Sequence, residues 1–188
     1  MSHASLLVAL EKTRVDEIGL EEALQEQMAP FDENEECFRD GSRWDWYQIG
    51  GRFTGMLDNY DPEKDPQNME SDGRVKWPTK WAQHKGDIGQ PDTLNAEYKG
   101  SYAFLRNRHW HEAERLGWFG GSAKTECEIF HPDDPDKVFG KCLHKDEKTG
   151  ARVICWNEPW ELWQVNFRKR FIEPLPADTV LVNVDYHV

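Results

Sequence analysis

Apolar positions follow two different periods along this chain, and the changes of period predict its elements. A continuous apolar run over residues 5–10 carries no helix signal and predicts a buried central strand. Between residues 20 and 28 the apolar positions recur at helical spacing, and Pro30 ends that predicted helix. The chain therefore opens with a strand followed by a helix.

The last third of the chain repeats these two patterns in the opposite order. Asn157 is the expected N-cap of a helix. One face of this helix carries an aromatic stripe, which consists of Trp160, Trp163, Phe167 and Phe171. Residues 180–188 then form an apolar strand. We expect the two terminal strands to be neighbours in one sheet. The fold class is therefore α+β, a single domain over residues 1–188 with an antiparallel or mixed sheet packed by two helices, of which a ferredoxin-like sandwich with insertions is one form.

Short elements and polar segments alternate in the middle of the chain. Residues 98–105 predict a strand, and residues 109–116 predict a short helix that Gly117 caps. Residues 138–139 and 151–155 predict the two strands of a hairpin. Residues 58–76 contain hardly an apolar residue, which indicates a flexible polar insertion at the surface.

Composition narrows the range of partners. The net charge of −12 argues against binding to a nucleic-acid backbone, which requires clustered lysines and arginines. The chain has no apolar run of 18 residues and no signal peptide, so we expect a soluble cytoplasmic protein without a membrane partner. Nine tryptophans and nine phenylalanines predict an aromatic-rich core.

Carboxylates gather between residues 16 and 36. Such a run is commonly a solvated helix face and loop. The alternative is an acidic surface that binds a basic partner. We assign to this acidic interaction surface the residues Glu21, Glu22, Glu26, Glu33, Glu35 and Glu36.

Residues 43–53 form an aromatic corner around Gly50 and Gly51, which permit positive φ and close approach of another group. Asp45 and Arg52 are expected to pair as carboxylate and guanidinium. Two interpretations stay open: a structural corner, or one wall of a site for a planar anionic ligand such as a nucleotide. The candidate residues for binding a ligand or partner are Arg43, Trp44, Asp45, Trp46, Tyr47, Arg52, His111, Asp185 and His187.

Asp185 and His187 lie two residues apart on the predicted last strand and so face the same side. A carboxylate beside an imidazole can orient it for acid–base chemistry. No nucleophile with an evident partner accompanies them, so we assign no catalytic residue.

Two cysteine–histidine pairs, Cys127 with His131 and Cys142 with His144, offer four ligands of the kind that zinc uses. Neither spacing is common in zinc sites, and independent structural residues are the alternative. We leave zinc open here and assign no metal site and no cofactor. The four cysteines of the chain lack CxxC spacing and are expected to be reduced thiols.

Three motifs together resemble a family of small uncharacterised proteins encoded by bacteriophages and prophages. They are residues 44–47 with 50–52, residues 117–120, and residues 175–188. The chain departs from the family pattern with Phe53 in place of Trp and Tyr186 in place of Cys, and the second change argues against catalysis or metal binding at that position. The resemblance implies a phage origin in a bacterial host cell and no particular reaction.

These observations together predict a phage accessory protein that acts by binding. Its partner is expected to be a host protein, and its role inhibition of a host defence system or host enzyme, in the manner of an anti-CRISPR protein. The alternative is a protein that binds or sequesters a nucleotide, or a small enzyme that uses the region of Asp45, Arg52 and His187. The sequence leaves enzymatic activity undecided and favours binding.

Overall fold

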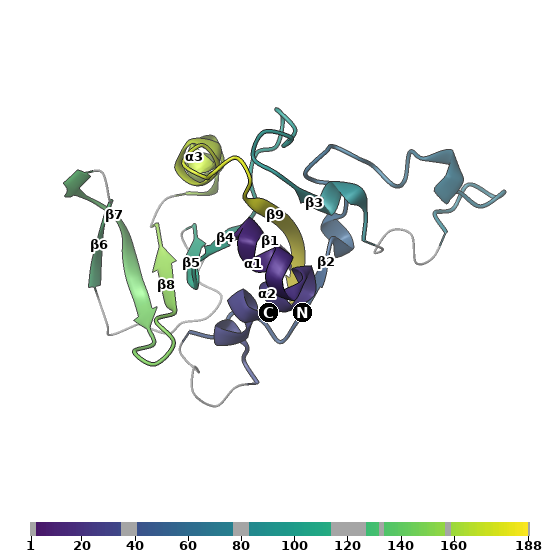
Figure 1. The fold of residues 1–188 in the computed structure, drawn as a ribbon. Coiled ribbons are helices and arrows are strands. Elements are labelled where there is room, and N and C mark those ends of the chain that lie inside the picture. The colour runs from purple at the N-terminus through teal and green to yellow at the C-terminus, as the bar shows by residue number, and fades with distance from the viewer. Residues whose placement is uncertain are drawn as a thin grey trace.

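The computed structural model describes residues 3–34, 41–76, 83–113, 127–131, 134–156 and 159–187. Within these residues a mixed sheet of nine strands has helices packed on both of its faces (Figure 1). The α+β class and the mixed sheet predicted from the sequence are confirmed.

The strand order along the sheet places the first and last strands side by side. In that order the strands are β2 (Trp46–Ile49), β9 (Val180–His187), β1 (His3–Leu10), β4 (Ala103–Arg106), β5 (His109–Glu112), β8 (Arg152–Cys155), β7 (Asp134–Lys145) and β6 (Cys127–His131), and β3 (Ile88–Gly89) pairs with β9 beyond the end of β2. β1 and β9 are antiparallel over their whole lengths, from His3 opposite His187 to Leu10 opposite Val180. The predicted adjacency of the terminal strands is confirmed, and Figure 1 shows both chain ends together.

The central strand β1 is buried on both sides. Leu6, Val8 and Leu10 pack toward α1 (Lys12–Ile18) and α2 (Leu20–Met28), on what we call the α2 face. Leu7 and Ala9 pack toward α3 (Trp160–Phe167), on the α3 face. Successive strand residues point to opposite faces, so this central strand reads as a continuous apolar run. Because helices cover both faces, the layering differs from that of a two-layer ferredoxin-like sandwich.

Residues 109–112 form strand β5 and not the predicted helix. Trp110 and Glu112 are buried while His109 and His111 are less so, which is the two-residue period of a strand. The remainder of that predicted helix, with its Gly117 cap, lies outside the described residues. The predicted hairpin is present as β7 and β8. β7 is longer than the predicted strand at residues 138–139, whereas β8 matches the prediction for residues 151–155 to within one residue.

The C-terminal helix is irregular at its end. α3 passes at Phe167 into a π-helical turn, Arg168–Ile172. This widened turn keeps Phe171 packed against Trp163 and Phe167, with ring centroids 5.2 Å from each. The aromatic stripe predicted from the sequence is therefore present in the core under the α3 face. Asn157, its predicted cap, lies outside the described part of the chain.

Short 3-10 turns occupy the connections, at η1 (Ala29–Phe31), η3 (Gly51–Phe53), η4 (Pro66–Asn68) and η6 (Lys85–Asp87). The polar segment 58–76 extends away from the sheet, on the side opposite β6 and β7 in Figure 1. Its regular structure consists of η4 and an isolated bridge between Met69 and Val75. This agrees with a polar excursion at the surface.

The Gly50–Gly51 turn closes against two buried carboxylates. Both glycines have positive φ, 75° and 57°. A Cβ on Gly50 would collide with the carboxylate of Asp87, and a Cβ on Gly51 with that of Asp185. Asp87 is fully buried and accepts hydrogen bonds from the Thr54 hydroxyl, the Gly55 and His84 amides, and the Asn183 side chain. The special backbone inferred from the sequence is confirmed, and its reason is close packing on acidic side chains.

Candidate functional site

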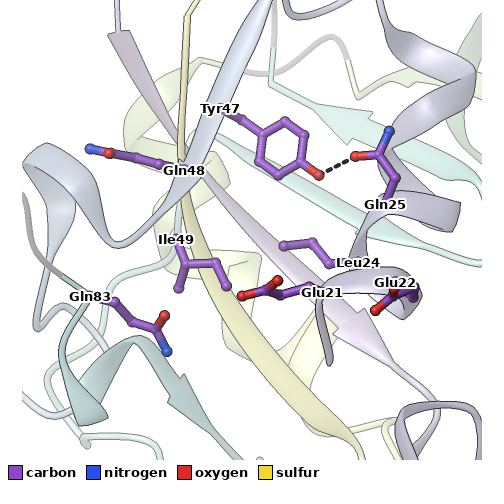
Figure 2. A pocket seen from close by; sticks show the side chains of 8 residues that line it. All are labelled: Glu21, Glu22, Leu24, Gln25, Tyr47, Gln48, Ile49 and Gln83. Atoms are coloured by element: carbon purple, nitrogen blue, oxygen red, sulfur yellow. Dashed lines mark hydrogen bonds between the residues drawn. The ribbon is translucent and has the colours of Figure 1, made fainter. Parts of the chain in front are cut away.

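A groove of about 610 Å³ opens between α2 and the edge strand β2 (Figure 2). Eight residues line it: Glu21, Glu22, Leu24 and Gln25 from α2, Tyr47, Gln48 and Ile49 from β2, and Gln83 from the connection before η6. The acidic segment and the aromatic corner, which the sequence singled out separately, therefore meet at one place.

The local periodicities explain which side chains reach this groove. α2 buries Ala23, Leu24 and Met28 against the sheet, which leaves Glu21 and Gln25 exposed. On β2, Tyr47 and Ile49 belong to the α2 face. Figure 2 shows Glu21 extending its carboxylate toward Ile49, while Gln48 turns away from the groove.

Tyr47 is the best-anchored polar group in the groove. Its hydroxyl donates a hydrogen bond to the side-chain oxygen of Gln25. Its ring packs edge-on against Trp44, with 4.9 Å between the two ring centroids. Burial raises the pKa of Tyr47, and the carboxylates of Asp32 and Glu21 raise it further. The phenol therefore stays neutral, and the local field is negative. None of the eight lining residues is a lysine or arginine.

The predicted acidic surface is divided among several environments. Glu21 and Glu22 line the groove, whereas Glu26 is bound by the guanidinium of Arg14, with a distance of 3.0 Å from Nε to Oε2. Glu33 is exposed beside the corner, and its backbone amide donates to the carbonyl of Trp44. Two further predicted members, Glu35 and Glu36, lie outside the described residues.

Arg43 and Trp44, two of the residues predicted to bind a ligand or partner, are buried. Arg43 donates from Nε and from one terminal nitrogen to the carboxylate of Glu112, at 3.1 and 3.3 Å. Both side chains of this ion pair are about 5% exposed or less. The indole of Trp44 donates to the carbonyl oxygen of Met28 at 3.0 Å. These two residues hold the corner in place from inside.

The predicted ion pair between Asp45 and Arg52 is wrong. Asp45 Oδ1 instead lies 2.6 Å from Nδ1 of His187, and the backbone amide of Arg52 donates to Asp185 Oδ2 at 2.9 Å. The reason is that the extended strand β2 separates them: Asp45 directly precedes β2, and Arg52 lies in η3 beyond its other end. The fully buried Asp185 also binds the imidazole of His3, with Oδ1 2.8 Å from Nδ1.

His111 lies on the α3 face and away from the groove. Its ring packs between Phe104 and Phe171, and its Nδ1 accepts a hydrogen bond from the indole of Trp156 at 3.1 Å. Burial lowers the pKa of His111 to about 3, and the charges of His109 and Arg170 lower it further. Its contacts are those of a neutral core histidine.

Sequence reasoning missed three residues that the structure brings to these places, namely His3, Gln25 and Gln83. A signal for His3 was present: if the terminal strands pair, a histidine near the start of one strand lies opposite a histidine at the end of the other. Gln25 lies one helical turn after Glu21 on the exposed side of α2, which also follows from the spacing. Nothing in the sequence near Gln83 indicates its position.

The zinc hypothesis is not tested by the described side chains. Backbone register places Cys127 opposite Cys142 on β6 and β7. The side chains of Cys127, His131 and Cys142 lie outside the part that the structure describes. Among the side chains that it does describe, no three of histidine, cysteine, aspartate and glutamate are grouped to hold a metal ion.

No protein-family model matches this chain, and no curated protein or solved structure matches it either. None of the helices in the described ranges has the length and apolar character needed to span a membrane. Function is therefore argued from the geometry alone.

Proposed function

We propose that the protein acts by binding a partner protein, which inserts a lysine or arginine side chain into the groove between α2 and β2. The observation that supports this most is the convergence of Glu21 and Glu22 with Tyr47 and Ile49 in one concave surface. A groove of this kind favours a cation over an anion, so a nucleotide phosphate is disfavoured there.

The lining suits a long basic side chain in particular. Lysine and arginine carry an apolar stem below a charged head. Leu24 and Ile49 offer apolar surface for the stem, and Glu21 and Glu22 offer carboxylates for the head. The ring of Tyr47 adds a π face to the same wall, which attracts a cation at short range.

The resemblance to phage proteins suggests which kind of partner protein the groove would bind. A phage accessory protein that inhibits a host defence system or a host enzyme acts through contact with a host protein. An acidic groove would engage a basic segment of that protein, such as one that otherwise contacts nucleic acid.

The test uses a pair of short peptides that differ in one atom-for-atom replacement, one with a central arginine and one with citrulline in its place. We expect the arginine peptide to shift the amide NMR signals of two segments, namely strand β2 and the first turn of α2. The citrulline peptide should shift the same signals much less. The double variant Glu21→Gln/Glu22→Gln should weaken arginine-peptide binding about tenfold, or about 1.4 kcal/mol, since each exposed ion pair contributes up to about 1 kcal/mol.

Glu97→Gln is the matched control, because Glu97 is exposed next to Tyr98, which packs on the α3 face. It should bind the arginine peptide like the wild type. The same three proteins, used as bait in a bacterial lysate, should retain a common partner except in the groove variant. Equal binding of the two peptides, or equal binding by the groove variant and the wild type, would refute the proposal.

A further inference from the structure

A row of three rings crosses the sheet on the side opposite the groove. Trp46 of β2 is directly opposite His187 of β9, and His187 is directly opposite His3 of β1. Residues directly opposite one another on neighbouring strands point to the same face. The ring centroids of His3 and His187 are 5.2 Å apart, and those of His3 and Trp46 are 6.0 Å apart.

Each histidine in this row is held by its own carboxylate through Nδ1. His3 Nδ1 lies 2.8 Å from Asp185 Oδ1, and His187 Nδ1 lies 2.6 Å from Asp45 Oδ1. A carboxylate at Nδ1 fixes the ring orientation and the tautomer, and it directs the chemistry to Nε2. Within the described part of the chain neither Nε2 atom has a hydrogen-bond partner, and the two side chains are 17% and 15% exposed.

The carboxylates differ in how firmly they are fixed. Asp185 is fully buried and also accepts the amide of Arg52, at the Gly51 turn that closes over it. Asp45 is one-third exposed and precedes β2 directly. His3 is thus held from the interior of the sheet and His187 from its rim, which leaves both Nε2 atoms at one surface.

We propose that His3 and His187 form an acid–base pair that cleaves phosphodiester bonds of small nucleotides. Two imidazoles at this separation can act on the two sides of one phosphorus atom. The 45% exposed ring of Trp46 offers a stacking surface for a base. Arg52, whose backbone amide donates to Asp185, has an exposed side chain that offers a positive charge for the phosphate. The net charge of −12 favours a small substrate over a long nucleic acid.

The step conserves atoms and protons. One neutral imidazole takes a proton at Nε2 from the attacking water as the water oxygen bonds to phosphorus. The other imidazole, protonated beforehand, gives its Nε2 proton to the leaving oxygen as the phosphorus–oxygen bond breaks. The products are a phosphate monoester and an alcohol, and proton exchange with solvent restores both imidazoles. Asp45 and Asp185 act as positioning residues for the two rings.

The experiment follows the hydrolysis of adenosine 2′,3′-cyclic phosphate by phosphorus NMR as a function of pH. We expect a bell-shaped profile for the wild type, because one imidazole must be neutral and the other protonated. His3→Gln and His187→Gln should each lower kcat at least about 100-fold. His109→Gln, a histidine of β5 outside the row, is the matched control and should retain full activity.

A second measurement does not depend on turnover, and its main part uses the wild type. Titration of the wild type with AMP should shift the imidazole NMR signals of His3 and His187 and quench the fluorescence of Trp46, while His111 stays unchanged. Arg52→Ala should weaken AMP binding without altering the groove signals of Tyr47. Absence of both turnover and AMP-induced shifts would overturn the proposal, and so would full activity in His3→Gln and His187→Gln. Equal peptide binding by the groove variant and the wild type, which would refute the groove proposal, leaves these results unaffected, so the two proposals fail separately.

Discussion

The two sides of strand β2 present opposite chemistry to solvent. Tyr47 and Ile49 line an acidic groove on the α2 face, whereas Trp46 joins two carboxylate-bound histidines on the α3 face. We propose a cation as the ligand of the groove and an anion as the ligand of the histidine row. One four-residue strand therefore contributes to both proposed sites, because its alternate side chains point to opposite faces.

The supports of the two sides also differ. The groove rests on helix periodicity and on one hydrogen bond between Tyr47 and Gln25. The histidine row rests on contacts between residues far apart in the chain, such as His3 with Asp185. Substitutions can therefore separate the two sides or disturb them together.

The largest effect is expected where one interaction supports both sides. Arg43→Met removes the buried partner of Glu112 and should lower the free energy of unfolding by about 3–5 kcal/mol, because an uncompensated carboxylate is left in the interior. Urea unfolding followed by tryptophan fluorescence measures the change. The double variant Arg43→Met/Glu112→Leu should recover most of the loss. A loss in the double variant as large as in Arg43→Met would show that the ion pair is not the cause.

An intermediate effect is expected from Gly51→Ala, which should act on the histidine row alone. A side chain there meets Asp185 in a backbone with φ of 57°, so unfolding free energy should fall by about 2–3 kcal/mol. The imidazole NMR signal of His3 should shift, and arginine-peptide binding by the folded protein should persist.

Gly73→Ala is the matched control for that substitution. Gly73 also has positive φ, 83°, but nothing lies within 4 Å of a Cβ built there. Its cost should be limited to backbone strain of about 1 kcal/mol. Equal losses in the two variants would mean that the close approach to Asp185 contributes nothing.

The smallest effect, over the range from pH 7 to pH 5, concerns His111 of β5, on the α3 face. The pKa of His111 is lowered to about 3 in the folded chain, so the unfolded chain, with a histidine pKa of about 6.5, binds the proton first. Stability is therefore intact at neutral pH and is lost as pH falls from about 6.5 toward 3, by up to about 1.4 kcal/mol per pH unit.

The comparison of wild type with His111→Asn isolates this contribution. Asparagine can offer an acceptor to Trp156 near the Nδ1 position but does not titrate in this range. Urea unfolding at pH 7, 6 and 5 should show a shallower decline for the variant. Parallel declines would mean that His111 does not titrate differently in the folded and unfolded chains.

Periodicity carried most of the fold prediction. The apolar runs of β1 and β9, the stripe of α2 and the polar segment 58–76 all follow from spacing alone. Residues 109–112 were predicted as part of a helix but form a strand. A short alternating stretch with one tryptophan is compatible with either element until its neighbours in the structure are known. The irregular end of α3 depends on packing against the sheet, which the sequence does not display.

The partners of the candidate residues were mostly unpredictable for a physical reason. Local pairing favoured Asp45 with Arg52, yet the structure pairs Asp45 with His187, 142 residues away, and Arg43 with Glu112, 69 residues away. Such contacts depend on strand register. The prediction that the terminal strands pair was part of what is needed to find the histidine row. The part that it lacked was the strand register, which places His3 directly opposite His187.

The pairing of β1 with β9 also governs the order of events during synthesis. β1 is synthesised some 170 residues before its neighbour β9, since His3 pairs with His187 and Leu10 with Val180. Until then an apolar strand has one unpaired edge, a state that invites aggregation or chaperone capture. Contacts of such long sequence separation slow folding. Both histidine–carboxylate pairs include a residue of β9, Asp185 in one and His187 in the other, so they can assemble only after β9 is made.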